Sequence, residues 1–391
     1  MDEAHMQVVV FLSIIGDLND FRHVKGRVFD LDLLLFCLLL TELKNCRRQR
    51  QRVRWLSGNW EWIREIWKTI ANKDSPQTAP SQPTLSRLLK GVGFWALAER
   101  YHAARTAILH EDKSDTTNSE TPETSPRHYA IDGKARAGIV SPVTGRTEID
   151  VTVFDVRTRE VLALRNLPDK QGESTAVQNI LKQKGRSFPP GIFSGDAGIT
   201  SPKVTARMVS AGHDYLLALK ENAGEVYSIC RDFEWDKVPV IHETSDEAHG
   251  RKEKRSLRRI SLGRSRTQQF SKYSKCGYIY QVESIRIENK KETRDVRYFI
   301  GSRGLKVILA KEILTIIREH WIIENGLHWV KDAVLDEDNS HVMSNRSSRV
   351  LSFFKNIVIT IGFSIYRSVQ RFVDEFDARP KAFTKLLLKL E

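Results

Sequence analysis

Two aspartates follow segments whose residue pattern is typical of short β-strands. Asp132 closes residues 128–132 (HYAID), and Asp196 comes directly after residues 191–195 (GIFSG). In α/β sheets, ligands gather at the carboxyl ends of strands. An aspartate in such a place is also a common turn residue or helix N-cap. Two of them, after two strands of one sheet, favour a shared acidic site.

A third carboxylate lies in a segment with helical periodicity. In residues 311–331, the polar side chains His320, Glu324, His328 and Lys331 recur at i, i+4, i+8 and i+11, so one continuous helix would place them on one face. A solvated helix face shows the same pattern. Glu324 together with the two aspartates would suit Mg²⁺ or Mn²⁺, which prefer oxygen ligands. Zinc held by His320 and His328 is a weaker alternative, because that spacing suits one ion poorly.

The elements around these acids alternate between strand and helix patterns. Three strands in sequence are followed by strands joined through helices, in the order β-β-β-α-β-α-β, which predicts an α/β fold with a mixed sheet and flanking helices. The expected strands are 128–132, 149–156, 161–164, 191–195 and 215–219, and the expected helices are 173–184 and 202–211.

The rest of the chain predicts further domains. Residues 1–110 are predicted to form a helical DNA-binding domain with a buried helix over 29–43. Residues 111–126 contain no large apolar side chain and are predicted to form a flexible linker. Residues 127–221 and 297–375 form the expected catalytic domain, interrupted by a basic β-rich insertion at 222–296. Two helices, 311–331 and 348–372, complete the catalytic domain.

Charge favours a polyanionic partner. Lys and Arg number 62 against 49 Asp and Glu, a net charge of +13. Two basic clusters are expected to contact DNA phosphates. The first is Arg47, Arg48, Arg50, Arg52 and Arg54, and the second is Arg251, Lys252, Lys254, Arg255, Arg258 and Arg259. Trp235, in the insertion, would stack on a flipped base, although such a tryptophan is more often a core residue.

Other features point to a reducing compartment without a membrane anchor. The four cysteines are scattered, without disulfide or zinc spacing, and no secretory signal begins the chain. The longest apolar run, 33–40, is far below the roughly 20 residues of a membrane span. We therefore expect a cytoplasmic, nucleoid-associated bacterial protein that does not bind membranes.

Several motifs in this order resemble one family. They are AIDGK at 130–134, DA at 196–197, HGRKE at 249–253, and HWIIEN at 320–325 followed by LHW. Together they are similar to the DDE insertion-sequence transposases of the ISAs/H-repeat-associated group, over roughly residues 10–370. The resemblance implies an RNase H-like catalytic domain in which Asp132, Asp196 and Glu324 bind metal. It also implies DNA contacts by Lys134, His320 and Lys331.

The wider class carries a Y-x2-R-x3-E-x6-K pattern on its last catalytic helix. Glu324 and Lys331 keep the E-x6-K spacing, whereas Ile317 and His320 stand at the Tyr and Arg positions. A protonated His320 would still reach a phosphate, without the fixed fork of arginine.

The expected function is that of a DNA transposase. It would bind terminal inverted repeats and target DNA as a homodimer, cleave 3′ ends and transfer strands, using two Mg²⁺ or Mn²⁺ ions. Two alternatives remain open: a domesticated, catalytically silent DNA-binding protein, and a metal-dependent DNA nuclease without strand transfer.

Overall fold

The computed structural model describes residues 3–16, 18–94, 96–101, 103–104, 126–140, 143–168, 172–248, 251–263, 267–288, 291–338 and 345–390. The chain forms two compact units. The helical unit comprises Met1–Thr121, Thr158–Glu160 and Gly326–Glu391, and the sheet unit comprises Pro122–Arg157 and Val161–Asn325. The expected linker, 111–126, lies outside the described residues except for Pro126.

The first five strands of the sheet unit follow the expected order. They are β1 (His128–Val140), β2 (Thr147–Asp155), β3 (Glu160–Leu167), β4 (Ile192–Gly195) and β5 (Asp214–Leu219). Their order in the sheet is β3-β2-β1-β4-β5, with β1 antiparallel to β2 and parallel to β4, and β4 parallel to β5. This mixed sheet confirms the predicted RNase H-like α/β fold.

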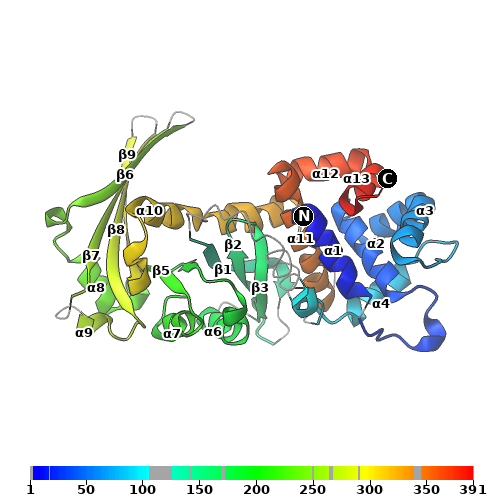
Figure 1. Ribbon diagram of the computed structural model, residues 1–391, viewed down its shortest axis with the longest axis horizontal. Helices are drawn as coiled ribbons and strands as arrows, with labels where there is room; N and C mark the ends of the chain where they lie inside the picture. Colours follow the sequence, from blue (N-terminus) through cyan, green and yellow to red (C-terminus); the bar gives the residue numbers. More distant parts are fainter. Residues whose placement is uncertain are drawn as a thin grey trace, which may run out of the picture. The chain divides into compact units, whose positions relative to one another are not determined.

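The insertion extends the same sheet. It contains β6 (Val240–Ala248), β7 (Arg251–Ser261), β8 (Cys276–Glu288) and β9 (Lys291–Ser302), all antiparallel to their neighbours. Because β9 pairs with β5, the nine strands are continuous, ending in the order β5-β9-β8-β7-β6 (Figure 1). Short helices α8 (Glu225–Arg231) and α9 (Thr267–Phe270) accompany them. The β-rich prediction for 222–296 is confirmed.

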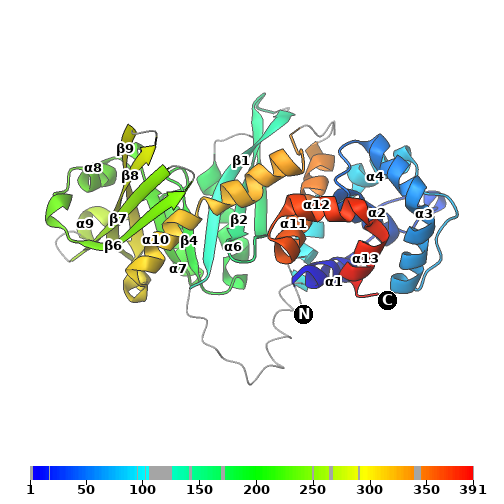
Figure 2. The ribbon, with the colours of Figure 1, turned by 90° about the horizontal axis from the view of Figure 1, so that it is seen from above.

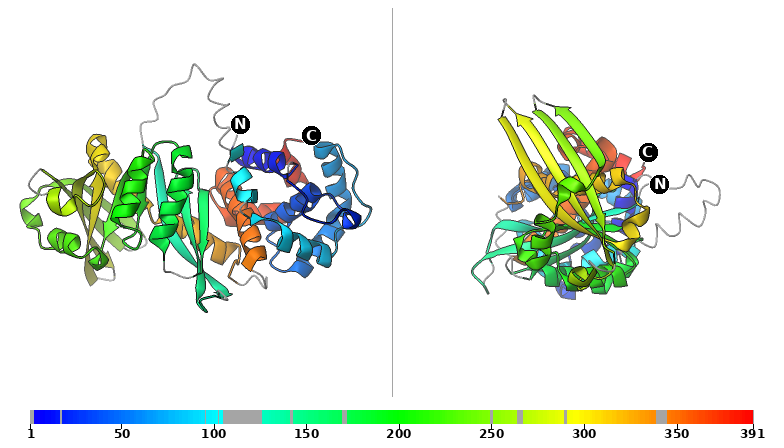
Figure 3. Two further views of the ribbon diagram at one scale, coloured as in Figure 1. Left: turned by 90° about the horizontal axis from the view of Figure 1, so that it is seen from below. Right: turned by 90° about the vertical axis from the view of Figure 1, so that its left-hand side faces the viewer.

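Helices cover both faces of the sheet (Figures 1 and 2). On one face lie α6 (Glu173–Lys184) and α7 (Pro202–Ser210), which stand in front of the sheet when it is seen from below (Figure 3). They pack on Tyr129 and Ile131 of β1. On the other face, α10 (Ala310–Glu319) packs on β4 and β5. Since side chains alternate along a strand, every second residue from His128 onward, including Asp132, is directed to the α10 face.

The long helix expected over 311–331 is interrupted. The helix α10 ends at Glu319 with His320 as its C-cap, and two π-helical turns follow, Glu324–His328 and Val330–Val334. A π-turn bonds i to i+5, so the predicted i, i+4, i+8, i+11 face does not persist. The expectation of one continuous polar face was therefore wrong.

The helical unit joins the two ends of the chain. Its helices are α1 (Glu3–Ile15), α2 (Leu31–Leu43), α3 (Gln49–Ala71), α4 (Gln82–Gly91), α11 (Asn345–Tyr366), α12 (Val369–Ala378) and α13 (Pro380–Leu388). All of α2 is buried, as predicted. The apolar helix α11 packs against α1, α2 and α4, so the sequence after Gly326 belongs with the N-terminal helices rather than with the catalytic domain.

The apolar segment 348–372 is not one helix. Arg367 has a φ of 53°, which ends α11, and the hydroxyl of Ser368 caps α12. Residues 346–366 are long and apolar enough to cross a membrane, but 72% of the apolar window is buried inside the structure. We interpret α11 as a core helix.

Short 3₁₀ turns complete the described elements. They are Val24–Gly26, Gly185–Ser187, Glu221–Ala223, Trp235–Lys237 and Arg303–Val307.

A buried ion pair lies in the helical unit. The Arg52 guanidinium donates to Glu42 Oε1 from Nη2 at 2.5 Å and from Nε at 3.1 Å, and both side chains are only 1% exposed. Arg52 therefore holds α3 to α2. The expectation that it contacts DNA was wrong, because the guanidinium is inside the fold.

We predict that Arg52→Ala destabilises the protein by about 3–5 kcal/mol, because it leaves the Glu42 carboxylate buried without its partner. Urea denaturation measures the change. Arg54→Ala, two residues away but exposed, should stay within about 0.5 kcal/mol of the parent. The double change Arg52→Met with Glu42→Leu should recover most of the loss. Equal losses for Arg52→Ala and Arg54→Ala would contradict this role.

Candidate active site

Asp132 and Asp196 become neighbours through the parallel pairing of β1 with β4. Ile131 lies opposite Gly195, and each aspartate is the next residue along its chain. Asp132 is not at a strand end, since β1 continues to Val140, but it lies at the point where β4 stops. The two carboxylates therefore share the α10 face, at the edge that the end of β4 leaves open.

The carboxylate of Asp196 is held by the turn that follows β4. Its Oδ1 accepts hydrogen bonds from the backbone N–H groups of Gly198 at 2.8 Å and Ile199 at 3.3 Å. Its backbone carbonyl accepts a hydrogen bond from the Thr200 hydroxyl at 3.0 Å. The side chain therefore has a fixed direction before any ligand arrives.

A fourth acid, Glu173, lies beside these two. It is the first residue of α6, and a Cβ atom on Gly133 would lie 2.4 Å from its Oε1. A Cβ on Gly198 would lie 3.5 Å from its Oε2 and 3.1 Å from Asp196 Oδ1. Two glycines therefore make room for these carboxylates. The sequence pattern predicts Glu173 only as the start of a helix, where an acid is favourable in any case.

Asp132 has a raised proton affinity in this site. Burial raises the pKa of Asp132 to about 7, and the charges of Asp196, Glu324 and Glu173 act in the same direction, while the backbone N–H of Gly133 opposes them. Glu324, in the π-turn, is exposed. The sheet unit thus gathers four carboxylates in one electrostatic field.

The donor set fits a hard divalent cation that keeps ligands of its own. Carboxylate oxygens are suitable donors for Mg²⁺, which usually takes one or two of them and completes its shell with water and substrate phosphate. No group of three His, Cys, Asp or Glu side chains within the described ranges is arranged to hold a metal ion by itself. Water, alone or together with DNA phosphate, would therefore complete the shell.

His320 is half-buried and belongs to a chain of hydrogen bonds inside the sheet unit. Its Nδ1 lies 2.9 Å from the Ser194 hydroxyl oxygen, which lies 2.7 Å from His128 Nε2. Desolvation, and secondly the neighbouring His128, lower the pKa of His320 to about 4, although Asp196 opposes them. His320 is therefore neutral at pH 7, contrary to the expectation that it contacts DNA as a cation.

Three other expected DNA contacts are covered. Lys331, in the helical unit, is 2% exposed and donates to the Ser352 hydroxyl at 3.1 Å. Lys134, in the sheet unit, is also buried. Trp235 is 5% exposed, and its indole N–H donates to the Cys230 carbonyl at 2.7 Å. Trp235 is therefore a core residue. The side chains of Lys331, Lys134 and Trp235 are all too buried to contact DNA.

The basic strand of the insertion is largely neutralised by its neighbours. Arg255 pairs with Asp246 and Glu253 at 2.9 and 2.7 Å, and Arg258 pairs with Glu283 at 3.2 Å. The pairs Arg251–Glu253, Lys252–Glu247 and Lys254–Glu243 lie at 2.9–3.2 Å, and Arg259 lies over the Tyr278 ring at 5.3 Å. The sequence of β7 alone did not show these acids, because most come from β6 and β8.

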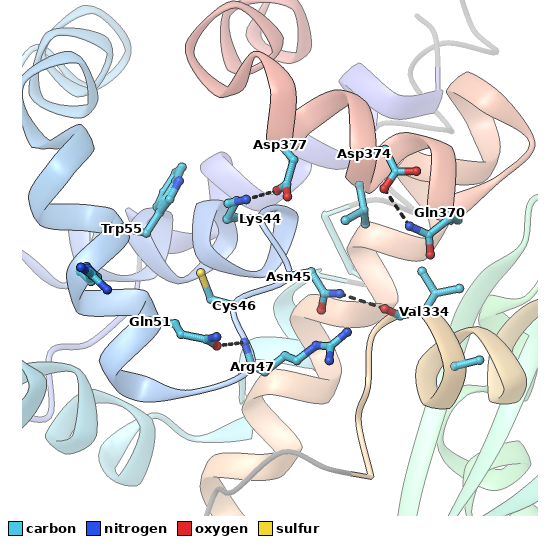
Figure 4. A pocket seen from close by; sticks show the side chains of 13 residues that line it. Lys44, Asn45, Cys46, Arg47, Gln51, Trp55, Val334, Gln370, Asp374 and Asp377 are labelled. Carbon is cyan, nitrogen blue, oxygen red and sulfur yellow. Dashed lines mark hydrogen bonds and ion pairs between the residues drawn. The ribbon is translucent and has the colours of Figure 1, made fainter.

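The N-terminal basic cluster is different. Arg48, Arg50 and Arg54 are exposed, and no ion pair within the described residues engages them. Arg47 is 51% exposed and pairs with Asp336 at 3.0 Å. Next to them, a cavity of about 590 Å³ within the helical unit is lined by Arg54, Trp55 and residues of α12 (Figure 4). Three exposed arginines without an ion partner among the described residues thus lie at the start of α3 and within its first two turns.

Comparison with known proteins assigns the family. The model of the family described as "Transposase DDE domain" matches residues 149–361, which include Asp196 and Glu324. This chain belongs to the transposase DDE domain family. The resemblance inferred from the motifs is thereby confirmed, and the chain is a DNA transposase by family. Its family generally uses divalent metal ions.

Two sequence relatives of this transposase also carry transposase names. It is 28% identical over 372 residues to YhhI of Escherichia coli K12, named as an H repeat-associated candidate transposase, covering 90% of this chain and 88% of that protein. It is 24% identical over 379 residues to YncI of Escherichia coli O157:H7, named as a candidate transposase, covering 90% and 86%. A piggyBac transposase synaptic complex with hairpin DNA matches with a TM-score of 0.39, 8% identity and coverage of 100% and 79%, too low to argue from.

We predict that Asp132→Asn makes the transposase relatively more stable as pH rises. The folded pKa of Asp132, about 7, exceeds the unfolded value of about 3.9, so ionisation opposes folding and the parent loses stability as pH rises between them. The asparagine removes this penalty. In EDTA, the melting temperature of the variant minus that of the parent should rise from pH 5 to pH 8. A difference in melting temperature that does not change with pH would contradict the raised pKa of Asp132.

Proposed function

We propose that this chain binds terminal inverted repeats, cleaves the 3′ ends of its element with water, and joins the resulting 3′-hydroxyls to target DNA. The observation that supports this best is the gathering of Asp132, Asp196 and Glu324 on the α10 face, where β4 ends. Carboxylates from two strands and one helical segment are what two-ion phosphodiester chemistry requires.

Asp132, Asp196 and Glu324 would hold two Mg²⁺ or Mn²⁺ ions, which supply charge stabilisation at the attacking and leaving oxygens. Asp196 is suited to this role because two backbone N–H groups orient its carboxylate. Glu324 is exposed and so accessible to a scissile phosphate. The replacement of the class's arginine by His320 does not argue against activity, since His320 has a place inside the fold.

Double-stranded DNA is the proposed partner, both as inverted repeat and as target. The free guanidiniums of Arg48, Arg50 and Arg54 supply the phosphate contacts in this proposal. A homodimer on DNA would hold two ends together, and two-fold pairing is the commonest symmetry for such an assembly.

We predict that Arg48→Ala, Arg50→Ala and Arg54→Ala together weaken DNA binding and lower the slope of log affinity against log salt by about 2–3 units. Fluorescence anisotropy at several salt concentrations measures the slope. The matched pair Arg255→Ala and Arg258→Ala should change it by less than about one unit, because those cations already have protein partners. The reverse ranking would place DNA on the insertion instead.

We predict that Glu324→Gln and Asp196→Asn each abolish Mg²⁺-dependent cleavage and strand transfer while binding to inverted-repeat DNA persists. The changes keep size but remove a charge from the metal-binding set, whose members act together. Gel assays of nicked and joined products measure the loss, with exposed Glu292→Gln as control. Cleavage by Glu324→Gln within about tenfold of the parent would move the third acid elsewhere. A parent that nicks without joining is a nuclease, and one that binds without nicking is a silent DNA-binding protein.

A further inference from the structure

A largely buried chain of polar side chains connects β1, β4 and the end of α10, the elements that carry or precede the three acids. His128 is on β1, Ser194 is on β4 and His320 caps α10, and the Ser194 hydroxyl lies 2.7 Å from His128 Nε2 and 2.9 Å from His320 Nδ1. We call these residues the His–Ser–His chain. No part of the chemistry proposed above uses it.

Each member precedes one of the acids by two or four residues along the sequence. His128 lies four residues before Asp132 on the same face of β1. Ser194 lies on β4 two residues before Asp196, so strand alternation directs both side chains to the same face of the sheet. His320 stands four residues before Glu324. Because β1 and β4 are in register at Ala130 and Ser194, a bond from Ser194 to His320 locates the third acid's segment against both strands.

The hydrogen bonds have one favoured direction. Glu319 Oε2 lies 3.7 Å from His128 Nδ1, which favours the proton on that nitrogen. His128 Nε2 then accepts from the Ser194 O–H, and the Ser194 oxygen accepts from His320 Nδ1–H. A serine between two neutral imidazoles can satisfy both, since it has one donor and two acceptor positions.

Local helix geometry cannot locate Glu324 by itself. The α-helical pattern stops at Glu319, and Glu324 begins a π-helical turn. A segment that departs from α-helical bonding needs another constraint, and the His320 side chain is bonded to the sheet at the point of departure. An apolar contact would bury this site at a lower desolvation cost, so three polar side chains point to a directional requirement.

We propose that the His–Ser–His chain is a positioning device that sets Glu324 in register with Asp132 and Asp196 for metal binding. This rests on the proposed function, because it assumes that the three acids share metal ions. Its members are positioning residues and do not touch the substrate. Outer residues that orient metal ligands typically contribute 10–100-fold to metal affinity or activity, which sets the size of the expected effect.

The test uses paired substitutions in the full-length protein. His320→Asn keeps a hydrogen-bonding atom close to the Nδ1 position, and His128→Gln keeps one close to Nε2, whereas His320→Leu and His128→Leu keep only volume. Ser194→Ala removes both bonds. Ser302→Ala is the matched control, because Ser302 is equally buried, donates to Asp214 and accepts from the Tyr215 N–H, all remote from the acids in sequence.

Mn²⁺ affinity without DNA, measured by electron paramagnetic resonance of free Mn²⁺, is the main readout, with urea stability measured in parallel. We expect Ser194→Ala and His320→Leu to weaken Mn²⁺ binding by about tenfold or more, and His320→Asn to stay within about threefold of the parent. Ser302→Ala should lower stability without changing Mn²⁺ affinity. If a leucine variant does not fold, Ser194→Ala against His320→Asn makes the same comparison.

Two failures are distinguishable. If the parent binds Mn²⁺ and Glu324→Gln weakens it, but Ser194→Ala and His320→Leu bind like the parent, the chain is merely structural and only this proposal is overturned. If the parent shows no Mn²⁺ binding that depends on Glu324, the shared metal site fails, and this proposal fails with it.

Discussion

The parallel pairing of β1 with β4 is the constraint on which the rest of the site depends. It puts Ile131 opposite Gly195, so that the following aspartates emerge on one face. A one-residue slip in this register would turn one of them to the α6 face, since strand side chains alternate. The apolar residues Tyr129, Ile131 and Phe193, buried beneath α6 and α7, oppose such a slip because they would have to move to the other face with it.

The same arrangement places like charges close together, and a bound cation would reduce their repulsion. Burial, with a smaller contribution from the charges of the three neighbouring carboxylates, raises the pKa of Asp132, so the metal-free fold opposes the ionisation of this acid. A structure optimised only for stability would not gather them. The space left by Gly133 and Gly198 for Glu173 and Asp196 points the same way, because a Cβ atom at Gly133 would displace the Glu173 carboxylate from its present position.

The two basic clusters show why charge density along a sequence is a weak guide to surface charge. The strand β7 is rich in Arg and Lys, yet acids on β6 and β8 pair with Lys252, Lys254, Arg255 and Arg258. The cluster on α3 contains one arginine inside the fold, Arg52, and exposed ones on either side of it. The helix turns its residues through all directions, so neighbours in sequence face different surroundings.

The strand and helix order, the β-rich insertion, the buried α2 and the family could be predicted from the sequence, because apolar periodicity and motifs such as AIDGK and HWIIEN are local. Glu173 could not be found in this way, since nothing near it in sequence reveals Gly133 beside its carboxylate. The hydrogen bond that joins His320, the C-cap of α10, to Ser194 spans 126 residues and could not be read from the local sequence. Three further features depend on partners distant in the chain and therefore appear only in the folded protein. They are the burial of Lys331, the ion pairs of Arg255, and the packing of the C-terminal helices on α1, α2 and α4.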